Sequence, residues 1–266
     1  MTTPVAVVTG AGSGIGRALA RQLDSENYQL VISDVNEAGL AETVASLRRA
    51  PVSLTLDVSQ REAVHAMADD VIRRFGRVDL VINNAGVALD ATVNEMKYED
   101  LEWIFGVNFW GMVYGTKAFL PQLLKQDSGT VVNVSSVFGI LGIPRQSGYC
   151  ATKFAIRGFT ESLWGELEGT GVNAISVHPG GIKTNIARAA RSYATPDTAE
   201  RNAREFEKMF RTTPEAAAAT ILRGVYEKKR RVLIGSDAHG IQLLSRLLPT
   251  AYAGLVAKLE QRLGQQ

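Results

Sequence analysis

The stretch VAVVTGAGSGIG, residues 5–16, leads from an apolar run through a glycine-rich turn into a segment of helix formers. The run 5–10 is rich in β-branched residues and predicts a buried strand. The segment 14–25 carries apolar residues at helical intervals and predicts a helix. Glycines in such a turn allow positive φ angles and let a ligand approach the backbone closely. Since the following helix presents free N–H groups to an anion, the stretch indicates a site for a pyrophosphate.

The alternation of strand and helix continues through most of the chain. Apolar runs that predict strands lie at 5–10, 28–34, 52–58, 78–84, 129–136, 172–180 and 231–236. Helical patterns lie at 14–25, 37–49, 60–75, 98–125, 149–168 and 214–229. Strands that are apolar throughout and separated by helices are typical of a parallel sheet covered on both faces. We therefore expect an α/β fold of the Rossmann type, a doubly wound parallel sheet of about seven strands in one domain over residues 1–266.

Two segments depart from this rhythm. Residues 185–213 are long for a connection within a compact domain, which indicates either a substrate lid or a variable surface excursion. The tail 240–263 has apolar residues on one side of two helical pieces that are broken at Pro249. This tail could cover the site, join subunits or rest on a membrane surface. Packing against its own domain or against a sister subunit is the more economical interpretation, so membrane contact is the less favoured one.

The composition argues against several classes of function. The net charge is +2, 21% of the 266 residues are charged, and the basic residues are scattered, so the chain offers no electrostatic footprint for nucleic acid. The basic run 228–231 precedes an apolar strand and is interpreted as a solvated helix end. The single cysteine, Cys150, allows no internal disulfide, and His65, His178 and His239 lack the spacing of a metal site. We interpret these histidines as surface or packing residues. Neither a signal-peptide pattern nor a membrane-length apolar run is present, so a cytoplasmic location is the default expectation.

Asp34 ends the second predicted strand, twenty residues after Gly14. A carboxylate at this point accepts hydrogen bonds from the adenosine ribose hydroxyls and repels a 2′-phosphate. Val35 and Asn36 follow it, so no basic residue is at hand to pair with such a phosphate. The pattern therefore favours NAD over NADP. The competing interpretation is that Asp34 is a turn residue or a helix N-cap.

Tyr149 and Lys153 are four residues apart in SGYCATKFAIRG, residues 147–158, which has helical periodicity. At this spacing the two side chains share one face of a helix. A nearby positive charge favours the phenolate and lowers the pKa of a tyrosine from its usual value of about 10, so Tyr149 could exchange protons near neutral pH. Most Tyr–Lys pairs at this spacing are ordinary surface or half-buried positions, so the pair by itself is weak evidence.

From Thr9 to Thr184 the chain resembles the classical short-chain dehydrogenase/reductase family. The motifs that carry the resemblance are TGAGSGIG (9–16), LDV (56–58), NNAG (83–86), VN (107–108), VSS (134–136), YCATK (149–153) and PGGIKT (179–184), and their combined order is highly specific. The resemblance implies an oxidoreductase with a nicotinamide cofactor. The implied catalytic residues are Asn108, Ser136, Tyr149 and Lys153. Ser136, rather than its neighbour Ser135, precedes the tyrosine by the thirteen positions usual in the family.

The resemblance also implies what each residue would do. Tyr149 would exchange a proton with the substrate oxygen, Lys153 would favour the phenolate and bond the nicotinamide ribose, and Ser136 would stabilise charge on the substrate oxygen. Asn108 would hold a water that passes protons between Lys153 and solvent. The implied cofactor-binding residues lie at strand ends and in the turns after them: Gly10, Ser13, Gly14, Ile15, Gly16, Asp34, Asp57, Val58, Asn84, Ala85, Gly86, Tyr149, Lys153, Pro179, Gly180, Ile182 and Thr184.

The substrate is less well defined than the chemistry. The loop 137–148 contains Phe138, Ile140, Leu141 and Ile143, which either line a hydrophobic substrate site or pack under the lid. The first interpretation favours a lipid- or steroid-like secondary alcohol or ketone. An NADPH-dependent carbonyl reductase and a non-catalytic nucleotide-sensing protein are the alternatives. Because members of the family are commonly tetramers, we expect a homo-oligomer, a tetramer, paired through the helices 98–125 and 149–168.

Overall fold

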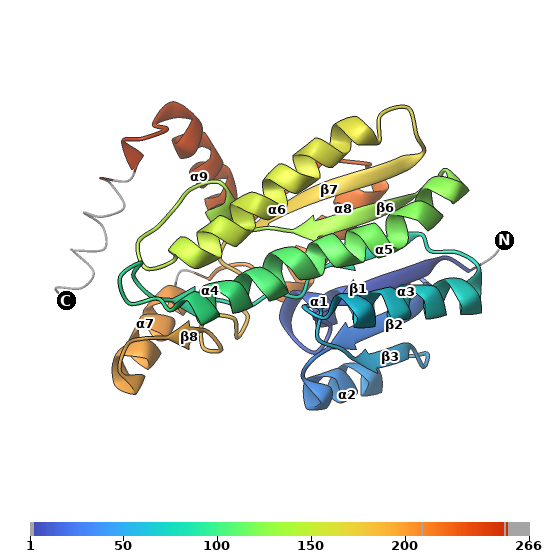
Figure 1. Cartoon of the computed structure of the whole chain (residues 1–266), viewed down its shortest axis with the longest axis horizontal. Helices are drawn as coiled ribbons and strands as arrows, with labels where there is room; N and C mark the ends of the chain where they lie inside the picture. Colours follow the sequence, from blue (N-terminus) through green and yellow to red (C-terminus); the bar gives the residue numbers. More distant parts are fainter. Residues whose placement is uncertain (1–2, 209, 253, 255–266) are drawn as a thin grey trace.

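The computed structural model describes residues 3–208, 210–252 and 254, and a seven-stranded parallel sheet runs through its centre (Figure 1). The strand order β3-β2-β1-β4-β6-β7-β9 confirms the predicted doubly wound α/β fold. The strands of this sheet are β1 (Val5–Thr9), β2 (Gln29–Asp34), β3 (Val52–Thr55), β4 (Leu80–Asn83), β6 (Gly129–Val134), β7 (Val172–Pro179) and β9 (Arg231–Ile234).

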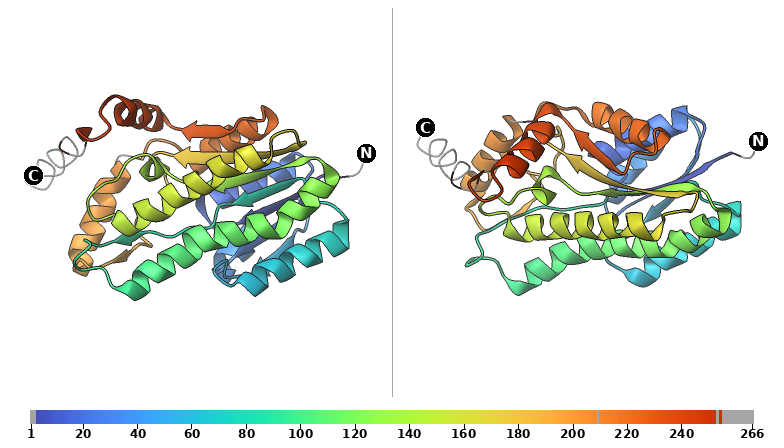
Figure 2. Two further views of the ribbon diagram at one scale, coloured as in Figure 1. Left: turned by 45° about the horizontal axis from the view of Figure 1, so that its top comes forward. Right: turned by 90° about the horizontal axis from the view of Figure 1, so that it is seen from above.

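Helices cover both faces of the sheet, with α1, α2 and α8 packed on one face and α3, α5 and α6 on the other (Figure 2). The helical segments are α1 (Gly14–Ser25), α2 (Glu37–Ala45), α3 (Arg61–Phe75), α4 (Tyr98–Phe105), η1 (Gly106–Trp110), α5 (Gly111–Gln126), η2 (Val137–Gly139), α6 (Ser147–Glu166), α7 (Pro196–Lys208), α8 (Pro214–Tyr226) and α9 (Ser236–Leu247). Most of the expected helices therefore form within a few residues of their predicted bounds.

Successive residues of a central strand enter opposite hydrophobic layers. In β1, Val5 and Val7 pack in the layer with α3 and α5, whereas Ala6 and Val8 pack in the layer with α1 and α8. This alternation follows from the two-residue repeat of a strand. Because helices cover both faces, both sets are buried, which explains why the strands are continuous apolar runs in the sequence.

The strand order reverses beside β1, which pairs with β2 on one side and with β4 on the other. In sheets of this kind, ligands bind in the crevice outside the carboxyl ends of the strands at such a switch point. The glycine stretch follows β1 and the NNAG stretch overlaps the end of β4, so both predicted motifs lie at this crevice.

The structure differs from the predicted pattern in several places. The expected helix 98–125 consists of α4, the π-helical turn η1 and α5 in succession. The segment 185–213 contains the helix α7 and the strand β8 (Arg191–Ser192), which pairs with β5 (Leu89–Asp90). Strands of two residues have no sequence pattern of their own, because only a partner segment defines them. The third strand ends at Thr55, earlier than the predicted bound of 58.

The C-terminal tail packs on its own domain where the structure describes it. Its first helix, α9, begins at Ser236, inside the predicted strand 231–236, and ends at Leu247. The backbone N–H of Gly142 donates to Tyr252 Oη at 3.2 Å, so the tail contacts the loop 137–148. Most of the second predicted helical piece, after Pro249, lies outside the described residues.

The basic run 228–231 is largely neutralised by carboxylates. Its ion pairs are Lys229 with Glu227, Arg230 with Glu168 and Arg231 with Glu161. These contacts agree with the interpretation of the run as a solvated helix end. Among the described residues, no helix has both the length and the apolar character needed to cross a bilayer.

Candidate active site

The turn after β1 depends on glycine at several positions. Gly10 and Gly14 have φ angles of +66° and +50°, a region that residues with side chains disfavour. A Cβ at Gly10 would lie 2.8 Å from the Cα of Ala85, and a Cβ at Gly16 would collide with the Gly10 carbonyl oxygen. In this turn the backbone after β1 therefore packs closely against the backbone after β4. It leaves the N–H groups at the start of α1 available to an anion.

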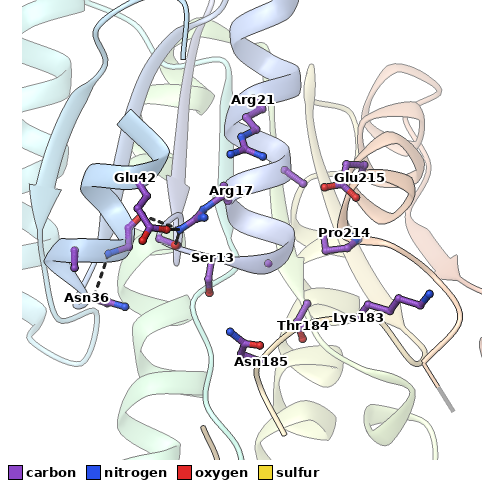
Figure 3. Close-up of a pocket in the computed structure, with 15 residues that line it drawn as sticks. Ser13, Arg17, Arg21, Asn36, Glu42, Lys183, Thr184, Asn185, Pro214 and Glu215 are labelled. Carbon is purple, nitrogen blue, oxygen red and sulfur yellow. Dashed lines mark hydrogen bonds and ion pairs between the residues drawn. The ribbon is translucent and has the colours of Figure 1, made fainter. Parts of the chain in front are cut away.

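A cleft of about 500 Å³ lies along the first turns of α1, and Gly12, Ser13 and Gly14 form part of its lining (Figure 3). Figure 3 shows Arg17 pointing toward Glu42 on one side of α1, with residues 183 and 215 on the other side. The loop after β7 closes the cleft near the turn. A Cβ at Gly14 would approach Thr184 Cγ2 to 2.9 Å. The cleft thus brings three distant parts of the chain to one helix N-terminus.

Asp34 is hydrogen-bonded to the glycine turn. Its Oδ2 accepts a hydrogen bond from the Gly12 N–H at 2.7 Å, and its Oδ1 accepts one from the Asn36 N–H at 2.8 Å. The second bond is the turn geometry of the competing interpretation, although the residue that caps α2 is Asn36. Each carboxylate oxygen retains lone-pair capacity for a ribose hydroxyl.

Arg17, the basic side chain nearest to this carboxylate in the turn, is engaged by α2. Its guanidinium donates to the carbonyl oxygens of Gly12 and Gly39, to Thr43 Oγ1 at 3.0 Å and to Glu42 Oε2 at 2.8 Å. These bonds hold the guanidinium against the second helix. They use the Nε and Nη2 atoms of the guanidinium, and Glu42 offsets its positive charge.

The NNAG segment braces the glycine turn from the neighbouring strand. Asn84 Nδ2 donates to the carbonyl oxygens of Thr9 at 3.0 Å and Gly10 at 3.2 Å. The preceding residue, Asn83, turns into the sheet, where its Nδ2 donates to Asn133 Oδ1 at 2.9 Å. These contacts tie the end of β4 to the glycine turn and to the centre of the sheet.

Three further residues of the implied cofactor-binding set have structural partners of their own. Asp57 is exposed and accepts a hydrogen bond from the Ser59 N–H at 2.9 Å. Val58 is buried and packs where a Cβ on Gly111 of α5 would collide with it. Ile15 packs against the core layer beneath α1. The side chains of Val58 and Ile15 therefore serve packing as well as lying near the cleft.

The PGGIKT loop after β7 is anchored by the C-terminal part of the chain. Asp237 Oδ2 accepts a hydrogen bond from the Gly181 N–H at 2.7 Å, and Ile182 forms a β-bridge with Thr212. A Cβ at Gly180 would collide with the Asp237 carboxylate. The motif itself gives no indication of Asp237, because this carboxylate reaches the loop only through the packing of α9.

Tyr149 and Lys153 share one face of α6, as their spacing predicted, with the Lys153 Nζ 5.5 Å from the centre of the tyrosine ring. Lys153 is only 3% exposed, and its Nζ donates to the Val134 carbonyl at 3.1 Å. Burial lowers the pKa of Lys153 to about 8. Burial also raises the pKa of the half-buried Tyr149 to about 12, while the Ser136 side chain acts in the opposite direction.

The tyrosine pKa thus moves opposite to the direction expected from the Tyr–Lys pair. Removal of the phenol from water disfavours its charged form and is the largest cause of the shift. The Lys153 ammonium bonds the Val134 carbonyl at the end of β6, and its Coulombic effect does not dominate at the phenol. In the protein without ligands, Tyr149 is accordingly protonated at neutral pH.

The two adjacent serines after β6 have different surroundings, as the family spacing suggested. Ser135 Oγ donates to the Lys153 carbonyl at 2.8 Å and is a structural residue. Ser136 Oγ accepts a hydrogen bond from the Phe138 N–H at 3.1 Å and adjoins the Tyr149 phenol. The Phe138 ring meets the Tyr149 ring edge-on, with 6.2 Å between the centroids. Three of the four predicted catalytic residues therefore come together at the carboxyl edge of the sheet.

Asn108 lies in the π-helical turn η1 and is 1% exposed. Its Oδ1 accepts from the Val87 N–H at 2.8 Å, and its Nδ2 donates to the Val87 carbonyl at 3.0 Å and to Thr152 Oγ1 at 3.1 Å. A Cβ at Gly86 would lie 3.3 Å from Asn108 Oδ1 and 3.4 Å from Lys153 Nζ, so all three residues meet. π-Helical turns are frequent at functional sites.

Side-chain contacts hold the segment 185–213 near the predicted catalytic residues. Arg191 forms an ion pair with Asp100 at 2.7 Å, and Tyr193 Oη donates to the other oxygen of the same carboxylate at 2.5 Å. Tyr193 also packs in the apolar cluster that contains Tyr149. The segment therefore reaches the surroundings of the tyrosine through side chains that are distant in sequence.

His178 is a packing residue, which is one of the two interpretations that the sequence allowed for the histidines. It is completely buried at the end of β7 and bonds the backbone of Ser136, so it is no surface residue. Its position directly before the PGGIKT loop is the one sequence feature that could have indicated a role near the site.

Comparison with known proteins places these features in a wider group. A family model described as short chain dehydrogenase matches residues 4–194. The putative oxidoreductase SadH of Mycobacterium tuberculosis is 46% identical over 259 residues, which cover 95% of this chain and 94% of that protein.

Two solved structures extend the similarity to three dimensions. A short chain dehydrogenase/reductase from Burkholderia phymatum, in complex with NAD, has a TM-score of 0.86 at 32% identity and covers 95% of this chain and 96% of its own. The alcohol dehydrogenase of the archaeon Thermococcus sibiricus, complexed with 5-hydroxy-NADP, has a TM-score of 0.74 at 27% identity, with coverages of 87% and 96%.

Proposed function

The chain belongs to the short-chain dehydrogenase family, and from this premise we propose that it is an NAD-dependent oxidoreductase that interconverts a secondary alcohol and a ketone. The observation that carries the proposal is the meeting of Ser136, Tyr149 and Lys153 beside the NNAG segment, at the switch point of the sheet. Residues 1–266 act as one domain in this proposal, with 185–213 as the substrate lid.

The glycine turn and the cleft beside α1 would hold the phosphates of a nicotinamide dinucleotide. Glycine at positions 10, 14 and 16 lets the turn pack closely against Ala85, Thr184 and the Gly10 carbonyl, and the positive end of the α1 dipole favours a pyrophosphate there. When bound, the nicotinamide supplies or accepts the hydride. The residues that would hold the cofactor form three groups: Gly10, Ser13, Gly14, Ile15 and Gly16 at the pyrophosphate; Asp34, Asp57 and Val58 at the adenosine; and Asn84, Ala85, Gly86, Tyr149, Lys153, Pro179, Gly180, Ile182 and Thr184 toward the nicotinamide.

The preference for NAD rests on the surroundings of Asp34. Its carboxylate lies against Gly12 at the cleft, where it would repel a 2′-phosphate. The Arg17 guanidinium pairs with Glu42 at 2.8 Å and donates to Gly39 and Thr43 of α2, so a carboxylate already offsets its positive charge. The two similar structures contain NAD in one case and an NADP derivative in the other, so this preference depends on the residues of this chain.

Tyr149 is the proposed general acid and base. With a pKa raised to about 12, it retains its proton at neutral pH and can donate it to a ketone oxygen during reduction. Oxidation requires the phenol to lose this proton, and the charged form of Lys153 favours that loss. Ser136, beside the phenol, would donate a hydrogen bond to the substrate oxygen as negative charge develops on it.

Asn108 would connect this pair to solvent through a water molecule. Its side-chain amide is already bonded to Val87 and Thr152. The relay water would therefore bind its backbone carbonyl, in the irregular π-helical turn. Protons could then pass between Lys153 and solvent without moving the amide.

A hydrophobic substrate is favoured by the loop 137–148. The Phe138 ring lies against Tyr149, and Ile140 and Ile143 are half-buried near it in the chain. The described part of the tail contacts this loop through the hydrogen bond from the Gly142 N–H to Tyr252 Oη. We propose a lipid- or steroid-like alcohol or ketone as the substrate class.

A homotetramer is the proposed assembly, paired through the long helices. Trp110 in η1 and Phe154 on α6 are 47% and 41% exposed, although both are large and apolar. A second copy of these helices could cover them. This arrangement leaves the carboxyl edge of the sheet open to cofactor and substrate.

Titration with NADH and NADPH tests the proposed cofactor first. The three tryptophans of the chain provide the quenching signal, together with nicotinamide fluorescence. NADH should bind more tightly than NADPH. The Asp34→Ser variant should show a smaller difference between its affinities for the two cofactors. Tighter binding of NADPH would overturn the role given to Asp34, and binding of neither would overturn the oxidoreductase itself.

Tyr149→Phe tests the chemistry. This variant should bind NADH like the parent and lose turnover of a hydrophobic secondary alcohol such as 1-phenylethanol. Retained turnover would contradict the acid–base role. A wild-type protein that binds NADH yet turns over none of a broad panel of alcohols and ketones would instead indicate a nucleotide-sensing protein.

A further inference from the structure

His178 links the end of β7 to the end of β6 through its side chain. Its Nδ1 lies 2.9 Å from the Ser136 carbonyl oxygen, and its Nε2 lies 2.9 Å from Ser176 Oγ. The backbone pairing of the two strands stops just before this point, with the Ser135 N–H bonded to the Val177 carbonyl at 2.8 Å. The imidazole therefore joins β7 to the chain after β6, one residue beyond this backbone hydrogen bond.

The two contacts determine which nitrogen of the imidazole carries the proton. A carbonyl oxygen can only accept, so Nδ1 must be the donor to Ser136. In the neutral ring Nε2 is then an acceptor, and the Ser176 hydroxyl donates to it. Both polar atoms of a completely buried side chain are thus satisfied by one tautomer.

The electrostatic surroundings keep this ring neutral. Burial is the largest cause and lowers the pKa of His178 to about 4. The positive charges of Arg231 and Arg157 act in the same direction, whereas the bond to the Ser136 carbonyl and the charge of Glu161 oppose them. At physiological pH the ring therefore remains a single-donor group.

The bond from His178 acts on the residue that carries the proposed hydroxyl. Ser136 is extended, with φ of −166° and ψ of 167°, at the start of the short helix η2. Its carbonyl also accepts from the Gly139 N–H at 2.9 Å, and its Oγ accepts from the Phe138 N–H at 3.1 Å. The tight turn holds the Ser136 residue on one side, and His178 holds it to the sheet on the other.

We propose that His178 is a positioning residue for Ser136. Its Nδ1–H fixes the orientation of the Ser136 peptide, and with it the direction in which Oγ faces Tyr149 and the substrate oxygen. This inference rests on the proposed function, because it requires the Ser136 hydroxyl to act in the reaction. Without the imidazole, the Ser136 hydroxyl would still be present, but it would not be held in the direction of the substrate oxygen.

The first test is the tautomer of His178, measured by long-range proton–nitrogen correlation on protein labelled with nitrogen-15 in its histidines. The signals are assigned by their loss in His178→Asn. Protonation at Nδ1 and not at Nε2, at neutral pH, is the expected result. Protonation at Nε2 alone would overturn the proposal, because Nδ1 could not then donate to Ser136. This test requires no substrate.

The second test compares the turnover of 1-phenylethanol with NAD in the wild-type protein and three variants. His178→Leu should lower kcat by about 10- to 100-fold, the usual result of misplacing a reacting group, with little change in KM for NAD. His178→Asn retains a side-chain N–H donor near the position of Nδ1 and should recover most of the loss. Ile175→Val, a mild core change on the same strand, controls for general destabilisation and should leave kcat nearly unchanged.

A double variant separates this inference from the function on which it rests. If His178 acts through Ser136, Ser136→Ala combined with His178→Leu should be no slower than Ser136→Ala alone. Additive losses would overturn the positioning role, as would an unchanged kcat in a folded His178→Leu protein. If Ser136→Ala itself keeps full activity, the catalytic role proposed for Ser136 is wrong. The positioning role of His178 is then wrong as well, because it requires that catalytic role.

Discussion

Replacement of Lys153 by methionine should make the protein more stable while abolishing its activity. Lys153 is buried, and its pKa is lowered from 10.5 to about 8. The charged side chain is therefore less stable in the folded protein than in the unfolded chain. At 1.36 kcal/mol per pKa unit, a shift of this size costs about 3 kcal/mol at pH 7. Methionine loses the hydrogen bond to the Val134 carbonyl, worth about 1 kcal/mol. We therefore expect Lys153→Met to raise the free energy of unfolding by about 2 kcal/mol at pH 7.

The pH dependence of this gain follows from the sign of the shift. Below about pH 8, Lys153 is charged in both the folded and the unfolded chain, so the full cost is present. Between about pH 8 and pH 10 the folded chain releases the proton while the unfolded chain keeps it, and the stability of the wild-type protein rises relative to the variant. Near pH 10 only about 1 kcal/mol of the cost remains, so the two proteins should become almost equally stable.

Urea unfolding without cofactor, at one fixed protein concentration, measures the free energy of unfolding of both proteins at pH 7 and at pH 10. Lys125→Met on the exposed end of α5 is a matched control, which should change stability by no more than about 0.5 kcal/mol at either pH. Lys153→Arg keeps a charge at both pH values and should be destabilised at both. A Lys153→Met protein that is less stable than the wild type at pH 7, or whose advantage does not shrink at pH 10, would refute the reasoning.

Three further changes probe the turn, the lid segment and the assembly. Gly16→Ala places a Cβ against the Gly10 carbonyl and should weaken NADH binding at least about tenfold, or about 1.4 kcal/mol, in a fluorescence titration; unchanged affinity would show that the turn adapts. Asp100→Ala removes the shared partner of Arg191 and Tyr193, so trypsin should cleave within 185–213 faster than in the wild type, and an equal rate would mean that other contacts hold the segment. Trp110→Glu should reduce the mass measured by light scattering below that of a tetramer, and an unchanged mass would place the interface elsewhere.

The elements that the sequence predicted best are those whose cause is local. The β-branched, apolar run at the start of the chain formed the central strand β1, and α1 has the bounds that its periodicity indicated. The glycine turn was predictable for a similar reason, since the positive φ angles at Gly10 and Gly14 exclude most other residues. The i and i+4 spacing of Tyr149 and Lys153 likewise placed them on one helix face.

The chemistry of the same pair was less predictable. Proximity in sequence suggested that the ammonium would lower the tyrosine pKa, but burial raises it and lowers that of Lys153 instead. Desolvation depends on what covers a side chain, and the covering residues come from distant parts of the chain. The spacing of two residues on one helix carries no information about that cover.

The amino-acid sequence by itself determined the order of strands and helices, the glycine turn and the set of residues that could act together. Only the tertiary structure decided that Asp237 anchors the loop after β7, that segment 185–213 is latched to Asp100, and that His178 holds the backbone of Ser136. Backbone conformation and side-chain period depend on neighbours within a few residues, whereas these contacts join residues between 42 and 91 positions apart. The contacts of Asp237 and His178 form because the sheet brings the ends of its strands to one edge, whereas Asp100 and Arg191 meet through the packing of α4 and β8.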